Sequence, residues 1–174
     1  MQQKVSSPVQ KGLIISLILI VFGLVLYFTN QYMNKTLSYI QYVILLGGII
    51  WSCNTYGKQM NGNVTFGNVF AHGFKTTAFV AAVIAVYTLL AVKFIFPEMM
   101  DKIMDAARQE MIKDGQLSES QIDQGIEMGK KFFVPFAIGG IIFFFALVGA
   151  IGSLIGAAMV KKNPQDPFAQ QPQM

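Results

Sequence analysis

The sequence predicts an all-α membrane protein with four transmembrane helices and an amphipathic helical hairpin between the third and the fourth. Four apolar runs are each long enough for the ~20 helical residues that a bilayer core requires. Hydrophobic residues make up 53% of the chain and charged residues only 13%, which is too apolar for a soluble domain of this size. Eight of the nine acidic residues lie between Glu98 and Glu127, so only this segment resembles soluble protein.

The domain organisation follows from these runs. The predicted spans cover about residues 12–31, 39–56, 74–96 and 132–160. With the segments between them they make a transmembrane domain of residues 1–160. No small-x-small cleavage site follows the first run, which is therefore expected to remain as an anchor. The tail, residues 161–174, is rich in Pro and Gln and is expected to be disordered.

Lysine residues beside the spans predict the orientation, because cytoplasmic flanks carry an excess of positive charge. Six lie on one side of the membrane, at positions 4, 11, 58, 75, 161 and 162. The other side has Lys35 in a short loop and Lys93 near the end of the third span. This count favours both termini in the cytoplasm. Lys130 and Lys131, directly before the fourth span on the predicted outer side, argue against it and leave the orientation open.

An interfacial elbow is predicted over residues 64–75, before the third span. A straight helix from Phe66 to Phe96 would be about 46 Å long, well beyond the ~30 Å hydrocarbon core, so the excess is expected to lie flat or to tilt. The polar face of this elbow would carry Thr65, Asn68, His72, Lys75 and Thr76, and its apolar face Phe66, Val69, Phe70 and Phe74. We expect Lys58, His72 and Lys75 to contact anionic headgroups or a partner. An elbow without a specific ligand is the alternative.

An extramembrane helical hairpin is predicted over residues 97–131. Met100, Met104 and Met111 recur on one face of its first helix. Gly115 can end that helix in the left-handed conformation, and a capping box of the form S-x-x-Q from Ser118 can start the second. Because methionine side chains adapt to irregular partners, the methionine stripe is the predicted contact surface.

Small residues recur on one face of the fourth span. These residues are Gly149, Gly152, Ser153 and Gly156, and two of the glycines form a G-x-x-x-G motif. Such a face lets helix backbones approach closely. It predicts either packing against the other three spans or a homodimer.

Residues that could carry chemistry are scarce in the predicted spans. The span centres contain no Asp, Glu, Arg or His, which counts against proton-driven transport because that chemistry needs an ionisable group inside the bilayer. The single cysteine, Cys53, excludes an internal disulfide and is expected to be a small buried side chain. The carboxylates that open the hairpin alternate with basic residues, as on a solvated face. No catalytic residue, metal site or cofactor is predicted.

Two sequence blocks carry a family resemblance. TFGNVFAHGFKTT enters the third span, and LSESQIDQGIEMGKKFFVP precedes the Gly-rich last helix. Together they resemble the bacterial membrane family called domain of unknown function 4199, over about Val9 to Val160. The resemblance implies a four-helix integral protein of the bacterial inner membrane. That family carries no assigned activity, so no catalytic residue can be transferred.

Two functions of different classes are compatible with these patterns. The leading hypothesis is a non-enzymatic scaffold or accessory subunit that uses its outer hairpin for contacts. The alternative is a small transporter or channel assembled as an oligomer about the glycines of the fourth span; a membrane enzyme ranks third. The expected partners are membrane lipids, a second copy of the chain or another membrane protein, and no nucleic acid.

Overall fold

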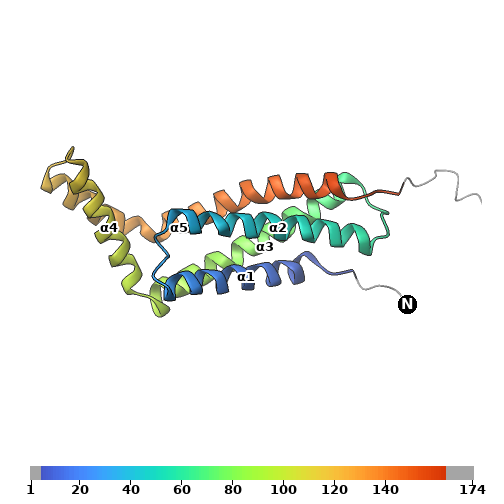
Figure 1. Cartoon of the computed structure of the whole chain (residues 1–174), viewed down its shortest axis with the longest axis horizontal. Helices are drawn as coiled ribbons and strands as arrows, with labels where there is room; N and C mark the ends of the chain where they lie inside the picture. Colours follow the sequence, from blue (N-terminus) through green and yellow to red (C-terminus); the bar gives the residue numbers. More distant parts are fainter. Residues whose placement is uncertain (1–4, 164–174) are drawn as a thin grey trace, which may run out of the picture. The chain divides into compact units, whose positions relative to one another are not determined.

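The computed structural model describes residues 5–163, except for the side chain of Lys35. It is helical, and no strand occurs among these residues. The helices in chain order are α1 (Pro8–Phe28), α2 (Lys35–Gln59), α3 (Phe66–Leu90), the π-helical turn η1 (Ala91–Ile95), α4 (Glu98–Asp114) and α5 (Glu119–Met159), as shown in Figure 1. Four of the helical segments are long and apolar enough to cross a membrane. The predicted all-α membrane fold is therefore confirmed, whereas most of the tail predicted to be disordered lies outside the described residues.

Local sequence signals set the start of α1 and α2. Ser7 caps α1 through a reciprocal capping box, in which its Oγ accepts from the Gln10 N–H and Gln10 Oε1 accepts from the Ser7 N–H, each at 3.2 Å. Pro8 then occupies the first helical turn, where its missing N–H costs nothing. Asn34 caps α2 by accepting hydrogen bonds from the N–H groups of the second and third helical residues.

The described residues form two compact units. The first unit contains α1, α2, α3 as far as Val83, and α5 from Phe144 onward. The second unit contains residues 84–143, which are the end of α3, η1, α4 and the beginning of α5.

The core of the first unit mixes aliphatic side chains with small hydroxyl side chains. Its fully buried members include Ile15, Leu45, Ile49, Val69, Val80, Ser16, Ser52, Thr76 and Thr77. Several hydroxyls donate back to their own helix: Ser16 to the Gly12 carbonyl at 2.8 Å, and Thr77 to the Gly73 carbonyl at 3.1 Å. Because these donors are satisfied within the helix, they can lie in an apolar bundle at little cost. Cys53 is also buried, as predicted.

Three chain segments meet at one end of the first unit. The Ser6 N–H donates to Gln59 Oε1 at 2.9 Å, which joins the start of α1 to the end of α2. The Asn163 N–H donates to the Gly62 carbonyl at 3.1 Å, which joins the residues after α5 to the α2–α3 turn. The start of α1, the α2–α3 turn and the end of α5 therefore share one end, as an even number of antiparallel crossings requires.

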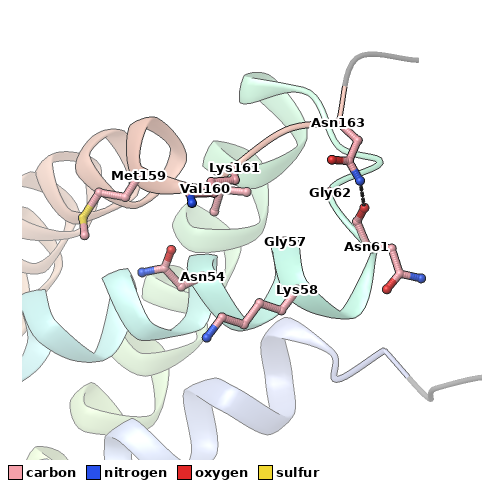
Figure 2. Close-up of a pocket in the computed structure, with 9 residues that line it drawn as sticks. All are labelled: Asn54, Gly57, Lys58, Asn61, Gly62, Met159, Val160, Lys161 and Asn163. Atoms are coloured by element: carbon pink, nitrogen blue, oxygen red, sulfur yellow. Dashed lines mark hydrogen bonds between the residues drawn. The ribbon is translucent and has the colours of Figure 1, made fainter. Parts of the chain in front are cut away.

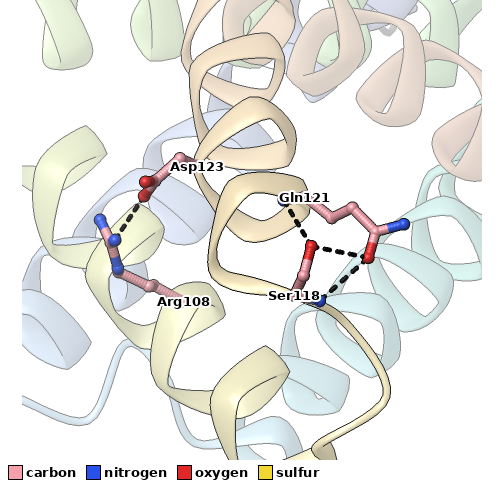
Figure 3. Close-up of polar contacts among 4 residues, drawn as sticks. All are labelled: Arg108, Ser118, Gln121 and Asp123. Atoms are coloured by element: carbon pink, nitrogen blue, oxygen red, sulfur yellow. Dashed lines mark hydrogen bonds and ion pairs between the residues drawn. The ribbon is translucent and has the colours of Figure 1, made fainter.

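The second unit contains the predicted helical hairpin. Gly115 ends α4 with a left-handed φ of 64°, and a capping box at Ser118 starts α5, with Gln121 Oε1 accepting from the Ser118 N–H at 2.9 Å (Figure 3). Both hairpin caps predicted from the sequence are thus present. The second hairpin helix and the fourth span are one 41-residue helix, α5, which contains Pro135 in its interior.

The region of the predicted elbow differs from expectation. α3 begins at Phe66 and runs without interruption through Gly73, so residues 64–75 form no separate element. Its predicted polar face is only partly exposed: Thr65, Asn68 and Lys75 are exposed, whereas His72 and Thr76 are buried. His72 and Thr76 turn inward beside Gly73, which packs closely: a Cβ atom there would lie 2.6 Å from both Cys53 Sγ and Ser153 Oγ.

Candidate functional site

A buried polar cluster joins three helices of the first unit. Its members are Lys11 on α1, Ser52 and Tyr56 on α2, and His72 and Thr76 on α3; we name it the Lys11 cluster. Lys11 is only 1% exposed, although lysine is rarely buried in proteins. The cluster is therefore the most unusual chemical feature of this unit.

The helical periodicity of each element places these side chains. Lys11 shares one face of α1 with the buried residues Ile15 and Leu19, at spacings of four residues. His72 and Thr76 are one turn apart on α3, and the Thr76 hydroxyl donates to the His72 carbonyl at 2.9 Å. The lysine thus points inward because its helix face is the packed face.

The contacts of Lys11 define the electrostatics of the cluster. Its Nζ donates to the Ser52 carbonyl at 3.1 Å and lies 3.4 Å from His72 Nε2. Because an ammonium group only donates, a hydrogen bond to His72 requires a neutral imidazole with Nε2 as acceptor. The His72 ring in turn stacks on Tyr56, with centroids 4.2 Å apart and an interplanar angle of 11°.

The charge of Lys11 is compensated by dipoles. All acidic residues within the described range lie between Glu98 and Glu127, in the second unit, so the described part of the first unit contains no carboxylate. A carbonyl oxygen, an imidazole nitrogen and the nearby Tyr56 ring, 6.0 Å from Nζ, surround the ammonium group. An ionisable group in such a position is by default a candidate for function.

The predicted lipid-contact residues do not form one site. Lys58 and Lys75 are exposed on α2 and α3, as expected of residues that meet headgroups or solvent. His72 is only 6% exposed and belongs to the Lys11 cluster. The expectation that His72 contacts headgroups beside the two lysines is therefore wrong, because α3 packs with this face inward.

The methionine stripe of the hairpin faces its own partner helix. Met100, Met104 and Met111 are half-buried. A Cβ atom on Gly129 would lie 3.0 Å from Met104 Sδ, and one on Gly125 would lie 4.0 Å from Met111 Sδ. Met104 and Met111 thus lie against glycines of α5, and the exposed contact surface of the hairpin must be sought elsewhere.

The small-residue face of α5 also packs within the chain. A Cβ atom would lie 2.1 Å from Thr77 Cγ2 at Gly149 and 2.6 Å from Cys53 Cβ at Gly156. At Gly152 it would lie 3.2 Å from Ile49 Cβ, and Ser153 is fully buried. Of the two predicted uses of this face, the structure shows packing against α2 and α3.

The family model described as "Protein of unknown function (DUF4199)" matches residues 10–162. The chain belongs to this family. The family resemblance predicted from the sequence blocks is therefore confirmed, and the match includes the Lys11 cluster, the hairpin and the small-residue face. No curated protein and no solved structure matches the chain.

Sequence reasoning missed Lys11 as a site residue of this DUF4199 chain. It was counted as a flanking charge because it lies close to the start of the first span. One signal could have identified it: Lys11, Ile15, Leu19 and Leu26 lie on a single helical face, which is the buried face of α1. The pairing with His72 could not be read in this way, because it depends on which helices are neighbours.

Proposed function

We propose that this chain is a non-enzymatic scaffold or accessory subunit of the bacterial inner membrane, which contacts a partner protein through its extramembrane hairpin. The observation that carries the proposal is a closed hairpin with two exposed apolar side chains, Met128 in its second helix and Phe132 where the fourth span begins. Both features belong to the second unit.

The hairpin is closed by packing and by two ion pairs. Met104 of α4 packs on Gly129 of α5, as described above. Arg108 pairs with Asp123 (Figure 3), and Lys130 Nζ lies 2.7 Å from Asp101 Oδ1. These exposed pairs contribute little to stability, but they fix the register of the two helices. A preformed surface loses less conformational entropy when a partner binds.

The exposed face of α5 has the composition of a contact surface. Met128 is 63% and Phe132 is 42% exposed, and their spacing of four residues places them on one face. They line a shallow hollow of about 290 Å³ together with Gln124, Glu127 and Lys131. An apolar centre bordered by charges of both signs is typical of protein interfaces.

The experiment is photo-crosslinking in the native membrane. A benzophenone amino acid at Met128 should give one discrete protein adduct. The same group at Gln109, which is exposed on α4, is the matched control and should not give that adduct. Phe132→Asp should reduce the adduct at Met128. Equal adducts at both positions, or an adduct that survives Phe132→Asp, would contradict the proposal.

The proposed orientation, with both termini in the cytoplasm, rests on the exposed lysines of the first unit. The four exposed lysines at or near the end where the α2–α3 turn lies are Lys58, Lys75, Lys161 and Lys162. Positive charge concentrates on the cytoplasmic side of membrane proteins. The hairpin would accordingly project from the outer side.

A small transporter or channel is the second candidate, and the Lys11 cluster is the observation that favours it. A buried ammonium group in a span can serve as a binding group for a transported anion. The glycines of α5 pack against α2 and α3 of the same chain, so they no longer favour an oligomer assembled about them. Anion flux into proteoliposomes, abolished by Lys11→Met, would favour the transporter. No flux above that of empty liposomes would favour the scaffold.

A further inference from the structure

A cavity of about 380 Å³ lies where α2 and α5 end, in the first unit (Figure 2). Its lining includes Lys58, Lys161, Asn54, Asn61, Asn163 and Met159. Two lysines and three asparagines thus line one hollow together with the apolar residues Met159 and Val160. The Lys11 cluster has no part in this lining.

The walls of the cavity are held by specific contacts. Gly57 of α2 lies directly against Val160, since a Cβ at this glycine would be 2.4 Å from Val160 Cγ1. Asn163 Nδ2 donates to the Asn61 carbonyl at 2.6 Å (Figure 2). Asn61 and Gly62 both have left-handed φ angles, 51° and 76°, which form the tight turn that places this carbonyl. The cavity is therefore built by the chain from both sides.

The position of the cavity along the helices indicates the level of the membrane interface. The apolar run of α5 ends at Met159 and Val160, and Lys161 follows at once. Lys58 lies in the last turn of α2. Met159 is 59% exposed, so an acyl chain could lie against it while the charged group of the same molecule meets the two lysines.

We propose that this cavity binds the headgroup phosphate of an anionic phospholipid. Lysine ammonium groups bind phosphate as point charges, and asparagine amides can donate hydrogen bonds to its oxygens. The described part of the first unit contains no carboxylate that would repel the ligand or neutralise the lysines. The proposal holds whether the protein acts as a scaffold or as a transporter.

The single tryptophan provides the measurement. Trp51 is 46% exposed on α2, seven residues before Lys58 and therefore on the same helical face. Bilayers of equal parts phosphatidylglycerol and phosphatidylcholine are prepared twice, with bromine on the acyl chains of one lipid or of the other. The ratio of Trp51 quenching in the two preparations gives the preference for the anionic lipid.

The expected result is a clear preference for phosphatidylglycerol in the wild-type protein. Lys58→Gln and Lys161→Gln should each lower the relative binding constant about 5-fold, since one lysine near an anionic surface contributes about 1 kcal/mol. The double variant Lys58→Gln with Lys161→Gln has a matched control, Lys93→Gln with Lys113→Gln, which also removes two charges, from exposed positions outside the first unit, and should leave the preference unchanged.

Three results would overturn the proposal. The first is a wild-type protein without preference, and the second is a preference that survives the loss of both Lys58 and Lys161. The third is an equal loss in the control variant, which would assign the effect to net charge alone.

A separate arm adds inorganic phosphate at constant ionic strength. If it abolishes the preference at millimolar concentration, the site belongs to a soluble phosphate rather than to a lipid.

Discussion

Replacing Gly149 with alanine tests whether the small-residue face of α5 holds the first unit together. The new Cβ would lie 2.1 Å from Cγ2, 2.3 Å from Oγ1 and 2.6 Å from Cβ of Thr77. Rotation about χ1 moves the first two atoms but not the Thr77 Cβ, so no change of rotamer removes the clash. An ordinary contact of 3.4 Å requires the two helices to separate by about 0.8 Å, which is 3.4 minus 2.6.

The cost of this separation can be isolated with a matched control. One extra methyl group in a packed interior typically costs about 1–3 kcal/mol. Alanine also has a higher helix propensity than glycine, by about 1 kcal/mol, but this gain applies to any glycine in the same helix. Gly139→Ala is the control, because nothing lies within 4 Å of its new Cβ. Gly149→Ala should therefore be less stable than Gly139→Ala by about 1–3 kcal/mol.

The free energy of unfolding of Gly149→Ala and of Gly139→Ala can be measured by SDS titration in mixed micelles, with far-UV circular dichroism as the readout. Thr77→Ala in the Gly149→Ala background should recover part of the loss, because it removes two of the three clashing atoms. Coupling of more than about 0.5 kcal/mol in this double-mutant cycle would identify the contact as direct. Equal stability of Gly149→Ala and Gly139→Ala would refute the packing argument.

The Lys11 cluster, the hairpin and the membrane orientation each give a further prediction. His72→Leu removes the acceptor that faces the buried ammonium group and should lower the free energy of unfolding by about 1–3 kcal/mol, whereas adding Lys11→Met should recover most of it. Met104→Asp, on the inward face of α4, should destabilise the hairpin by up to about 3 kcal/mol and increase its cleavage by protease, whereas Met128→Asp on the exposed face should not. A topology reporter at Gly115 should report the outer side of the membrane, and one fused to the C-terminus should report the cytoplasm.

Each of these predictions has a contrary outcome. If His72→Leu with Lys11→Met is no more stable than His72→Leu alone, the two side chains are not coupled. If the Met104 and Met128 variants are cleaved at the same rate, the stripe does not hold the hairpin closed. A cytoplasmic signal at Gly115 would reverse the proposed orientation.

Local signals carried much of the prediction because they act within one helix. Length and apolarity predicted four helices able to span a bilayer. Gly115 and the Ser118 capping box bounded the hairpin, and both depend only on backbone geometry within a few residues. The family was recognised from two short blocks, and the match over residues 10–162 confirms it.

The assignment of helix faces was only partly correct, and α3 shows the reason. The sequence argument placed Phe66 and Phe74 on the apolar face of an interfacial elbow and His72 with Thr76 on its polar face. In a membrane protein the surroundings are as apolar as the core, so phenylalanine can face outward and small or polar side chains can fill the interface. His72 and Thr76 turn inward beside Gly73, which packs closely.

The class of the protein, its apolar helices, its hairpin caps and its family could be predicted from the sequence, because hydrophobic length and capping chemistry are properties of each segment alone. The packing of the helices was needed to show that Lys11 meets His72, that Met104 and Met111 face α5, and that Lys58 and Lys161 line one cavity. These pairings join residues on different helices. They depend on which helix faces meet, and hydropathy cannot choose among faces that are nearly all apolar.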